Sequence, residues 1–173
     1  MTTRAGESQM VFSLEGETFS SVGGERAIRT PALDMCIRAK DMPARWKERR
    51  TSVMDQPRFG QRDYASSRFY IEEGGVEKAA INFETVVYKD HRSAASVFAG
   101  TLSKMGFLRL SKLDLGDMGA MIEVPGQPSR HLRAVLFTER NVMGLIMLSC
   151  ATDQHISDSW LISMGRLMVS RAR

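Results

Sequence analysis

The clearest pattern lies in the second half of the chain, where apolar and polar residues alternate and then change to helical spacing. In residues 80–88 (AINFETVVY), the side chains at 81, 83, 85 and 87 share one side of an extended chain, which predicts a strand. Apolar residues in 92–105 recur every three or four positions and predict an amphipathic helix. Three further strands are expected at 118–124, 131–138 and 142–150, followed by a helix from about Asp153 to Ser170.

The first half has a less regular pattern. Residues 46–54 favour a strand with a charged outer face, because a tryptophan, a threonine and a valine suit the pleat. Phe69, Ile71 and Val76 indicate a further strand region, which EEGG (residues 72–75) interrupts as a turn of hairpin type. Residues 55–67 contain proline, glycine and polar residues and indicate a long loop or a short irregular helix. The segment 31–43 leaves helix and extended chain both open.

These elements indicate one α+β domain over residues 31–173, preceded by an N-terminal extension over residues 1–30. Met10, Phe12 and Leu14 alternate within the extension and are compatible with a peripheral hairpin. We expect a mostly antiparallel sheet with the two main helices packed on one face, an αβ sandwich. The other face is then exposed to solvent or covers a partner.

Composition supports a folded, soluble chain. Of the 173 residues 43% are hydrophobic and 25% are charged, values typical of a globular domain. The longest apolar run, 142–151, is about half of the roughly 20 residues that a membrane-spanning helix needs. As the sequence stands it predicts a cytoplasmic protein, or an exported one if a leader was removed. Cys36 and Cys150 have apolar neighbours and are expected to be buried, with a disulfide between them left open.

No residue pattern indicates catalysis. Asp117 lies between Gly116 and Gly119, a setting in which aspartate usually fixes a turn by accepting backbone N–H groups. The three histidines have no metal-ligand spacing, and the chain contains no phosphate-binding loop or nucleophile elbow. We therefore predict a non-enzymatic protein with no catalytic residue, no metal site and no cofactor.

A basic window is the strongest functional signal. Between positions 45 and 68 the chain has seven basic and three acidic residues. This excess equals the net charge of +4 of the whole chain. Such a surface binds an acidic protein, lipid headgroups at a membrane surface or, where aromatic rings stack bases, nucleic acid. A solvated strand face gives the same pattern, and the aromatic rings are equally compatible with positions in the core. The candidate partner surface consists of Arg45, Trp46, Lys47, Arg49, Arg50, Arg58, Arg62 and Tyr64.

Methionine is frequent, with 12 residues in the chain. Several fall on the expected core faces, where methionine fills gaps in packing. The alternative is an adaptable, methionine-lined pocket between sheet and helices that carries a lipid or another small molecule.

Short motifs resemble those of the PsbP/Mog1-like group, small domains of bacterial exported proteins and lipoproteins. The matching residues are Asp41-Met42-Pro43-Ala44-Arg45-Trp46, Val86-Val87-Tyr88 before Ser93-Ala94-Ala95, Leu115-Gly116-Asp117, the hairpin at Arg140-Asn141, and Arg166 or Arg171 in the last helix. The lipobox cysteine of that group is not found. The resemblance implies a non-enzymatic accessory or ligand-binding role, often on a larger assembly.

Together these observations predict a binding or assembly module, an accessory subunit that docks on a protein partner. A small-molecule carrier and nucleic-acid binding through residues 45–68 are the alternatives.

Overall fold

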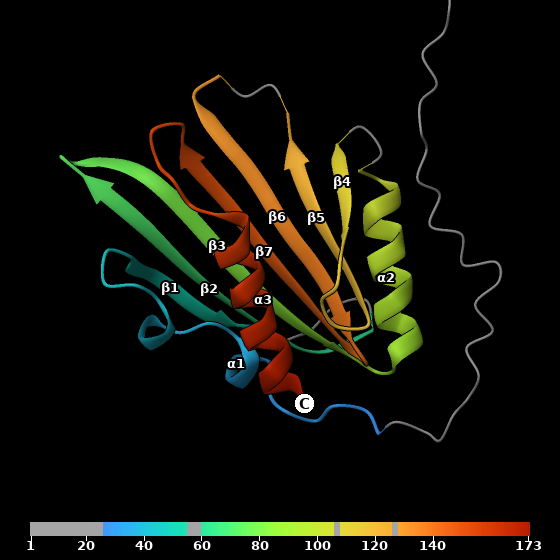
Figure 1. Ribbon diagram of the computed structural model, residues 1–173. Helices are drawn as coiled ribbons and strands as arrows, with labels where there is room; N and C mark the ends of the chain where they lie inside the picture. The colour runs from blue at the N-terminus through green and yellow to red at the C-terminus, as the bar shows by residue number, and fades with distance from the viewer. Residues whose placement is uncertain (1–25, 55–59, 106–107, 126–127) are drawn as a thin grey trace, which may run out of the picture.

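The computed structural model describes residues 26–54, 60–105, 108–125 and 128–173, and it contains a seven-stranded antiparallel sheet (Figure 1). Neighbouring strands follow the order β1-β2-β3-β7-β6-β5-β4. The strands are β1 Lys47–Val53, β2 Gln61–Glu73, β3 Val76–Tyr88, β4 Arg109–Leu113, β5 Met118–Val124, β6 Arg130–Glu139 and β7 Val142–Ala151. The helical elements are α1 Ala32–Met35, the 3-10 turn η1 Ala39–Asp41, α2 His91–Ser103 and α3 Asp158–Ala172. The expected α+β class with a mostly antiparallel sheet is confirmed.

Two meanders build the sheet. Strands β1, β2 and β3 are consecutive neighbours, and the β2–β3 turn contains Gly74 and Gly75 at φ 59° and 76°, which glycine adopts without steric cost. Helix α2 then carries the chain to the far edge, where β4, β5, β6 and β7 return strand by strand to β3. The two edge strands, β1 and β4, therefore lie at opposite sides of the sheet.

The inner face, defined as the sheet face that carries α1 and α3, holds the main core. Both helices lie on this side in Figure 1. Phe83, Phe137 and Ile146 point from three strands toward Leu161 and Met168 of α3. Such burial of large apolar side chains is the main favourable contribution to folding.

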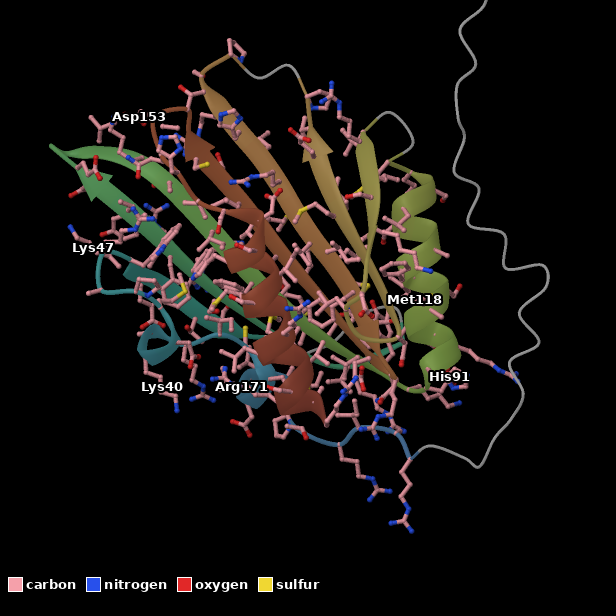
Figure 2. The ribbon with its side chains drawn as sticks, viewed as in Figure 1. Lys40, Lys47, His91, Met118, Asp153 and Arg171 are labelled. Atoms are coloured by element: carbon pink, nitrogen blue, oxygen red, sulfur yellow. The ribbon has the colours of Figure 1, made fainter. Side chains whose placement is uncertain are left out.

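A charged contact ties the end of α3 to the chain before β1. Arg171 donates from Nη1 to the carbonyl of Cys36 at 2.9 Å and from Nη2 to the Asp41 carboxylate at 2.7 Å (Figure 2). Burial acts to raise the pKa of Asp41, but hydrogen bonds from Arg171 and the Arg38 amide outweigh it, so that pKa lies below its ordinary value.

Helix α2 packs on the opposite, outer face. Phe98 and Leu102 of α2 contact a second apolar cluster that includes Ala120, Ile122 and Leu136. The expectation that both main helices lie on one face is therefore wrong. The reason is visible in the central strands: along β6 the side chains at 135 and 137 join the inner core, and those at 134 and 136 join the outer cluster.

Three parts of the secondary structure differ from the sequence-based expectation. Residues 61–67 are strand rather than loop, because they pair with β1 on one side and β3 on the other; residues 55–59 lie outside the described part. Strand β4 was not expected, because its five residues, mostly exposed, carry no strong alternation. The last helix begins at Asp158, where the Ser157 hydroxyl caps it by accepting the Trp160 N–H at 3.2 Å.

Residues 31–43, for which the sequence allowed either helix or extended chain, contain both. Residues 32–35 form the short helix α1, an extended stretch follows, and η1 ends at Asp41. The domain also includes the residues just before it, since Ile28 is buried and both its N–H and its carbonyl bond to the Asn141 side chain. The hairpin considered for the N-terminal extension falls on residues 1–25 and lies outside the described residues.

Asp117 shapes a turn, as predicted. Its carboxylate accepts the Arg140 N–H, and its own N–H donates to the Thr138 carbonyl at 2.7 Å. Gly116 has φ 63°, and a Cβ there would lie 2.1 Å from the Thr138 oxygen. This corner therefore requires glycine and is structural.

Both cysteines are free and buried, which confirms their interpretation as small core residues. Burial raises the pKa of the Cys36 thiol, while its hydrogen bond with Ser67 opposes the shift. Within the described ranges, no helix has the length and apolar character needed to cross a membrane.

Candidate partner surface

The structure separates the residues of the predicted surface. Trp46 is only 7% exposed and stacks on Trp160 of α3, with ring centroids 5.8 Å apart. Tyr64 is half-buried and packs with Val86, Tyr88 and Ala94 near the start of α2. Trp46 therefore belongs to the packed interior, and the Tyr64 ring is partly covered by its neighbours.

The remaining predicted residues are basic. Arg45 is exposed in the turn before β1, and Arg62 is exposed at the start of β2. Arg58 lies outside the described residues. Lys47, Arg49 and Arg50 lie on β1, the edge strand, and the structure brings these three together (Figure 2 labels Lys47).

A β-bulge explains why they gather on one side. Lys47 pairs with Tyr70, and Arg50 pairs with Arg68, with a register shift between Glu48 and Arg50. Directly opposed residues of an antiparallel pair share a face, and a bulge re-aims the extra residue. The three basic side chains of β1 consequently lie on the outer face of the sheet.

Tyr70 stands at the centre of this group. The Arg49 guanidinium carbon lies 4.5 Å from the Tyr70 ring centroid, and the Lys47 ammonium lies 5.9 Å from it. Lys47 also forms an ion pair with Glu72 at 3.5 Å, and Arg49 forms one with Glu77 at 2.6 Å. These two cations are thus partly neutralised within the chain.

Arg50 and Arg68 are in a different situation. They are directly opposite each other on β1 and β2, both exposed, and like charges in this position repel. Within the described ranges neither forms an ion pair with an acidic residue. We call the group Lys47, Arg49, Arg50, Arg68 and Tyr70 the basic surface.

Sequence reasoning included Arg68 in the basic window but not among the candidate residues, and it did not single out Tyr70. Their part in the site follows from pairing between two strands, which no local pattern shows. The EEGG turn was the available signal, because a hairpin at 72–75 places residues 68 and 70 on the strand that β1 joins.

An apolar strip continues from the basic surface across the outer face. The row that begins with Arg50 and Arg68 passes through Asn82 on β3 to Met147 on β7 and Ala134 on β6. Met147 is 40% exposed, one of few large hydrophobic side chains open to solvent in the described residues. We call Ala80, Leu132, Ala134 and Met147 the outer strip.

Helix α2 leaves this half of the outer face open. Its contacts lie at the other end of the strands, on Val86 and Tyr88 of β3, Leu136 of β6 and Ala120 of β5. Residues of the outer strip are half-buried or exposed, and Ala134 marks the boundary where the strip meets the cluster under α2. Arg130 borders the strip, with its Nε donating to the Ser149 hydroxyl at 2.8 Å.

Tyr64 and Glu84 lie where the outer strip meets the cluster under α2. Burial raises the pKa of Tyr64, and the nearby charge of Glu84 adds to this effect. The Glu84 carboxylate also accepts a hydrogen bond from Asn82 Nδ2 at 2.7 Å. This acid is therefore engaged within the sheet and does not pair with Arg68.

Two shallow depressions elsewhere were considered as sites. One, of about 380 Å³, lies at the C-terminal end of α3 beside Asp114 and Arg166. The other, of about 310 Å³, lies at the N-terminal end of α3 and is bordered by His131, His155 and Glu123. Across the parts of the chain that the structure describes, no group of three or more His, Cys, Asp or Glu side chains is arranged to hold a metal ion.

Methionines pack mainly into the cores. Met35, Met121 and Met168 are buried in the inner cluster, and of these Met121 borders the second depression. Neither depression is lined by a set of methionines. The geometry thus offers no support for a methionine-lined carrier pocket at these two places.

No protein-family model matches the sequence, and no curated protein matches it. Among solved structures, the extracellular domain of PknH from Mycobacterium tuberculosis is similar, with a TM-score of 0.59 and 9% sequence identity. The match covers 82% of this chain and 94% of that one. At this identity the likeness concerns the fold alone.

Proposed function

We propose that this chain is a non-enzymatic docking module, an accessory subunit that binds an acidic partner protein through the basic surface. The observation that carries the proposal is the cross-strand pair of Arg50 and Arg68, which no acidic side chain neutralises within the described residues. Two such guanidinium groups offer fixed forks that match carboxylates bidentately.

Other basic residues of the described chain differ from this pair in position. Lys78, Arg133 and Arg171 each form an ion pair with an aspartate, while cations such as Arg92 and Lys112 form none within the described residues but do not lie opposite a second arginine on a paired strand. Arg50 and Arg68 instead repel each other, and a partner carboxylate placed between them relieves that repulsion while adding hydrogen bonds.

Nucleic acid fits the same surface less well. Base stacking needs exposed aromatic rings, but Trp46 is buried against Trp160 and Tyr64 is half-buried against the start of α2. Tyr70 remains, but the Arg49 guanidinium lies over its ring. Charge without stacking favours an acidic protein surface.

We also infer that the sandwich is of the PsbP/Mog1-like type, whose members are associated with accessory roles. Motif residues that carry the resemblance have structural roles here: Asp41 binds Arg171, Trp46 stacks on Trp160, and Asp117 forms its turn. This supports a shared scaffold, and the accessory role is part of the proposal.

The test is native mass spectrometry of the full chain purified gently from its own cells. We expect the wild-type chain in a defined assembly, and the R50E/R68E variant outside it with at least about a tenfold loss. R92E/K112E reverses two exposed basic residues elsewhere and should remain assembled. Equal behaviour of both variants, or an assembly with nucleic acid or anionic lipid alone, would refute the proposal.

A further inference from the structure

We infer that the open half of the outer face receives an amphipathic acidic helix of the partner, which packs beside α2. This inference rests on the proposed function and names the form of the partner. Its basis is the juxtaposition of the basic surface with the outer strip on one continuous stretch of the sheet.

Basic side chains border the apolar outer strip. Arg50 and Arg68 line one side of the outer strip on β1 and β2, and Arg130 borders another part of it. Between them lie the small residues Ala80 and Ala134 and the exposed Met147. A segment that fits has an apolar stripe for the strip and carboxylates along its margins.

The open part of the outer face has about the width of one helix. Arg68 on β2 and Met147 on β7 are two strands apart, a separation of roughly 10 Å at the usual strand spacing. A helix with its side chains has a diameter of about 10–12 Å. One helix lying over β3 and β7 therefore contacts the strip and reaches Arg68 with its flank.

The chain itself already packs one helix, α2, on this face. Helix α2 already covers the other end of the same face by placing Phe98 and Leu102 against small and branched residues of β5 and β6. A second helix beside it completes the layer in the way that α1 and α3 complete the inner face. The partner supplies what this chain does not place there within its described residues.

Alternative occupants fit less well. Addition of a strand to β1 is disfavoured, because this edge carries four charged residues in KERRTSV and a bulge, both of which oppose edge pairing. A second copy of the chain would bring one basic surface against another, which like charge opposes.

The experiment places the photo-crosslinking residue p-benzoylphenylalanine at Tyr70 in the full chain, expressed in its own cells. The crosslinked segment is then sequenced by mass spectrometry. We expect a segment of another protein with acidic residues flanking apolar ones at helical spacing. The same crosslinker at Ser96, exposed on α2, serves as the control and should not capture that segment.

The M147K variant separates the two levels of the proposal. It adds a positive charge to the outer strip, so an amphipathic helix should lose at least about tenfold in crosslink yield at Tyr70, whereas a partner held by charge alone should gain. An unchanged or increased yield would overturn the helix and leave the acidic partner standing. A crosslink to nucleic acid or to residues 1–25 of the same chain, or no crosslink above the Ser96 control, would overturn both.

Discussion

The two faces of the sheet are built from the same strands and differ in how completely helices cover them. Phe83 on β3 is fully buried on the inner face, whereas Met147, on the neighbouring strand β7, is 40% exposed on the outer face. Helices α1 and α3 close the inner face, and α2 closes only part of the outer one. Within the described residues, the inner face therefore contributes most to stability, and the outer face is the one on which we propose that a partner docks.

The largest expected effect is the loss of a large inner side chain. Phe83→Ala should lower the free energy of unfolding by about 3–5 kcal/mol, because it removes buried apolar surface and leaves a cavity. Met147→Ala on the outer face should change it by less than about 0.5 kcal/mol. Urea unfolding of both variants measures this contrast, and similar losses would show that the outer strip is packed in the isolated chain.

Loss of the Asp41–Arg171 ion pair on the inner face should lower the free energy of unfolding more than loss of the Arg49–Glu77 pair on the outer face. Asp41→Asn should cost about 1.5–3 kcal/mol, because Arg171 then keeps its charge without a carboxylate partner. Glu77→Gln, which breaks the pair with Arg49, should cost at most about 1 kcal/mol, since both side chains are partly exposed to solvent.

The same pair predicts a dependence on pH. The pKa of Asp41 is lower in the folded chain, so its contribution is present above the unfolded value of about 3.9 and is lost as pH falls through the folded pKa. Thermal unfolding of wild type and D41N from pH 7 to pH 2 should converge at the acid end. A constant difference across this range would contradict the assignment.

Two glycines test packing on either side of the sheet. A Cβ at Gly144 would lie 2.1 Å from the buried Phe137 ring, so Gly144→Ala should cost about 1–3 kcal/mol. Gly100 on α2 has no atom within 4 Å of such a Cβ, and Gly100→Ala should stabilise by up to about 1 kcal/mol. Chemical unfolding of both variants decides whether the inner face is the tighter one.

A small gain in stability is expected from a charge reversal in the basic surface. Arg68→Glu replaces repulsion across the β1–β2 pair by attraction to Arg50 and should raise the free energy of unfolding by about 0.2–1 kcal/mol. The same change should weaken partner binding, though less than the R50E/R68E variant, because Arg50 remains. A variant that loses stability would show that Arg68 serves the fold rather than a partner.

Much of the sheet could be predicted from the sequence, because β3, β5, β6 and β7 have long apolar or alternating patterns. The face on which α2 packs could not, since Ala134 and Leu136 are apolar on the outer side just as their neighbours are on the inner side. Residues 61–67 read as a loop because Ser66 and Ser67 are polar, and their burial follows from pairing with strands on both sides.

The candidate site was predicted from local charge and from the aromatic residues interleaved with it. Composition located the basic window, but the bulge that gathers Lys47, Arg49 and Arg50 depends on register between strands. Trp46 could not be assigned to core or surface, because its partner Trp160 lies far along the chain.

The most direct test is oxidation of Met147 by dilute peroxide in the native assembly, read by mass spectrometry. This side chain is exposed in the isolated chain and lies in the middle of the proposed docking area. We predict rapid oxidation in the free chain and at least about tenfold slower oxidation in the assembly, reversed when salt releases the partner. Equal rates in both states would show that the partner does not cover the outer face and would contradict the account.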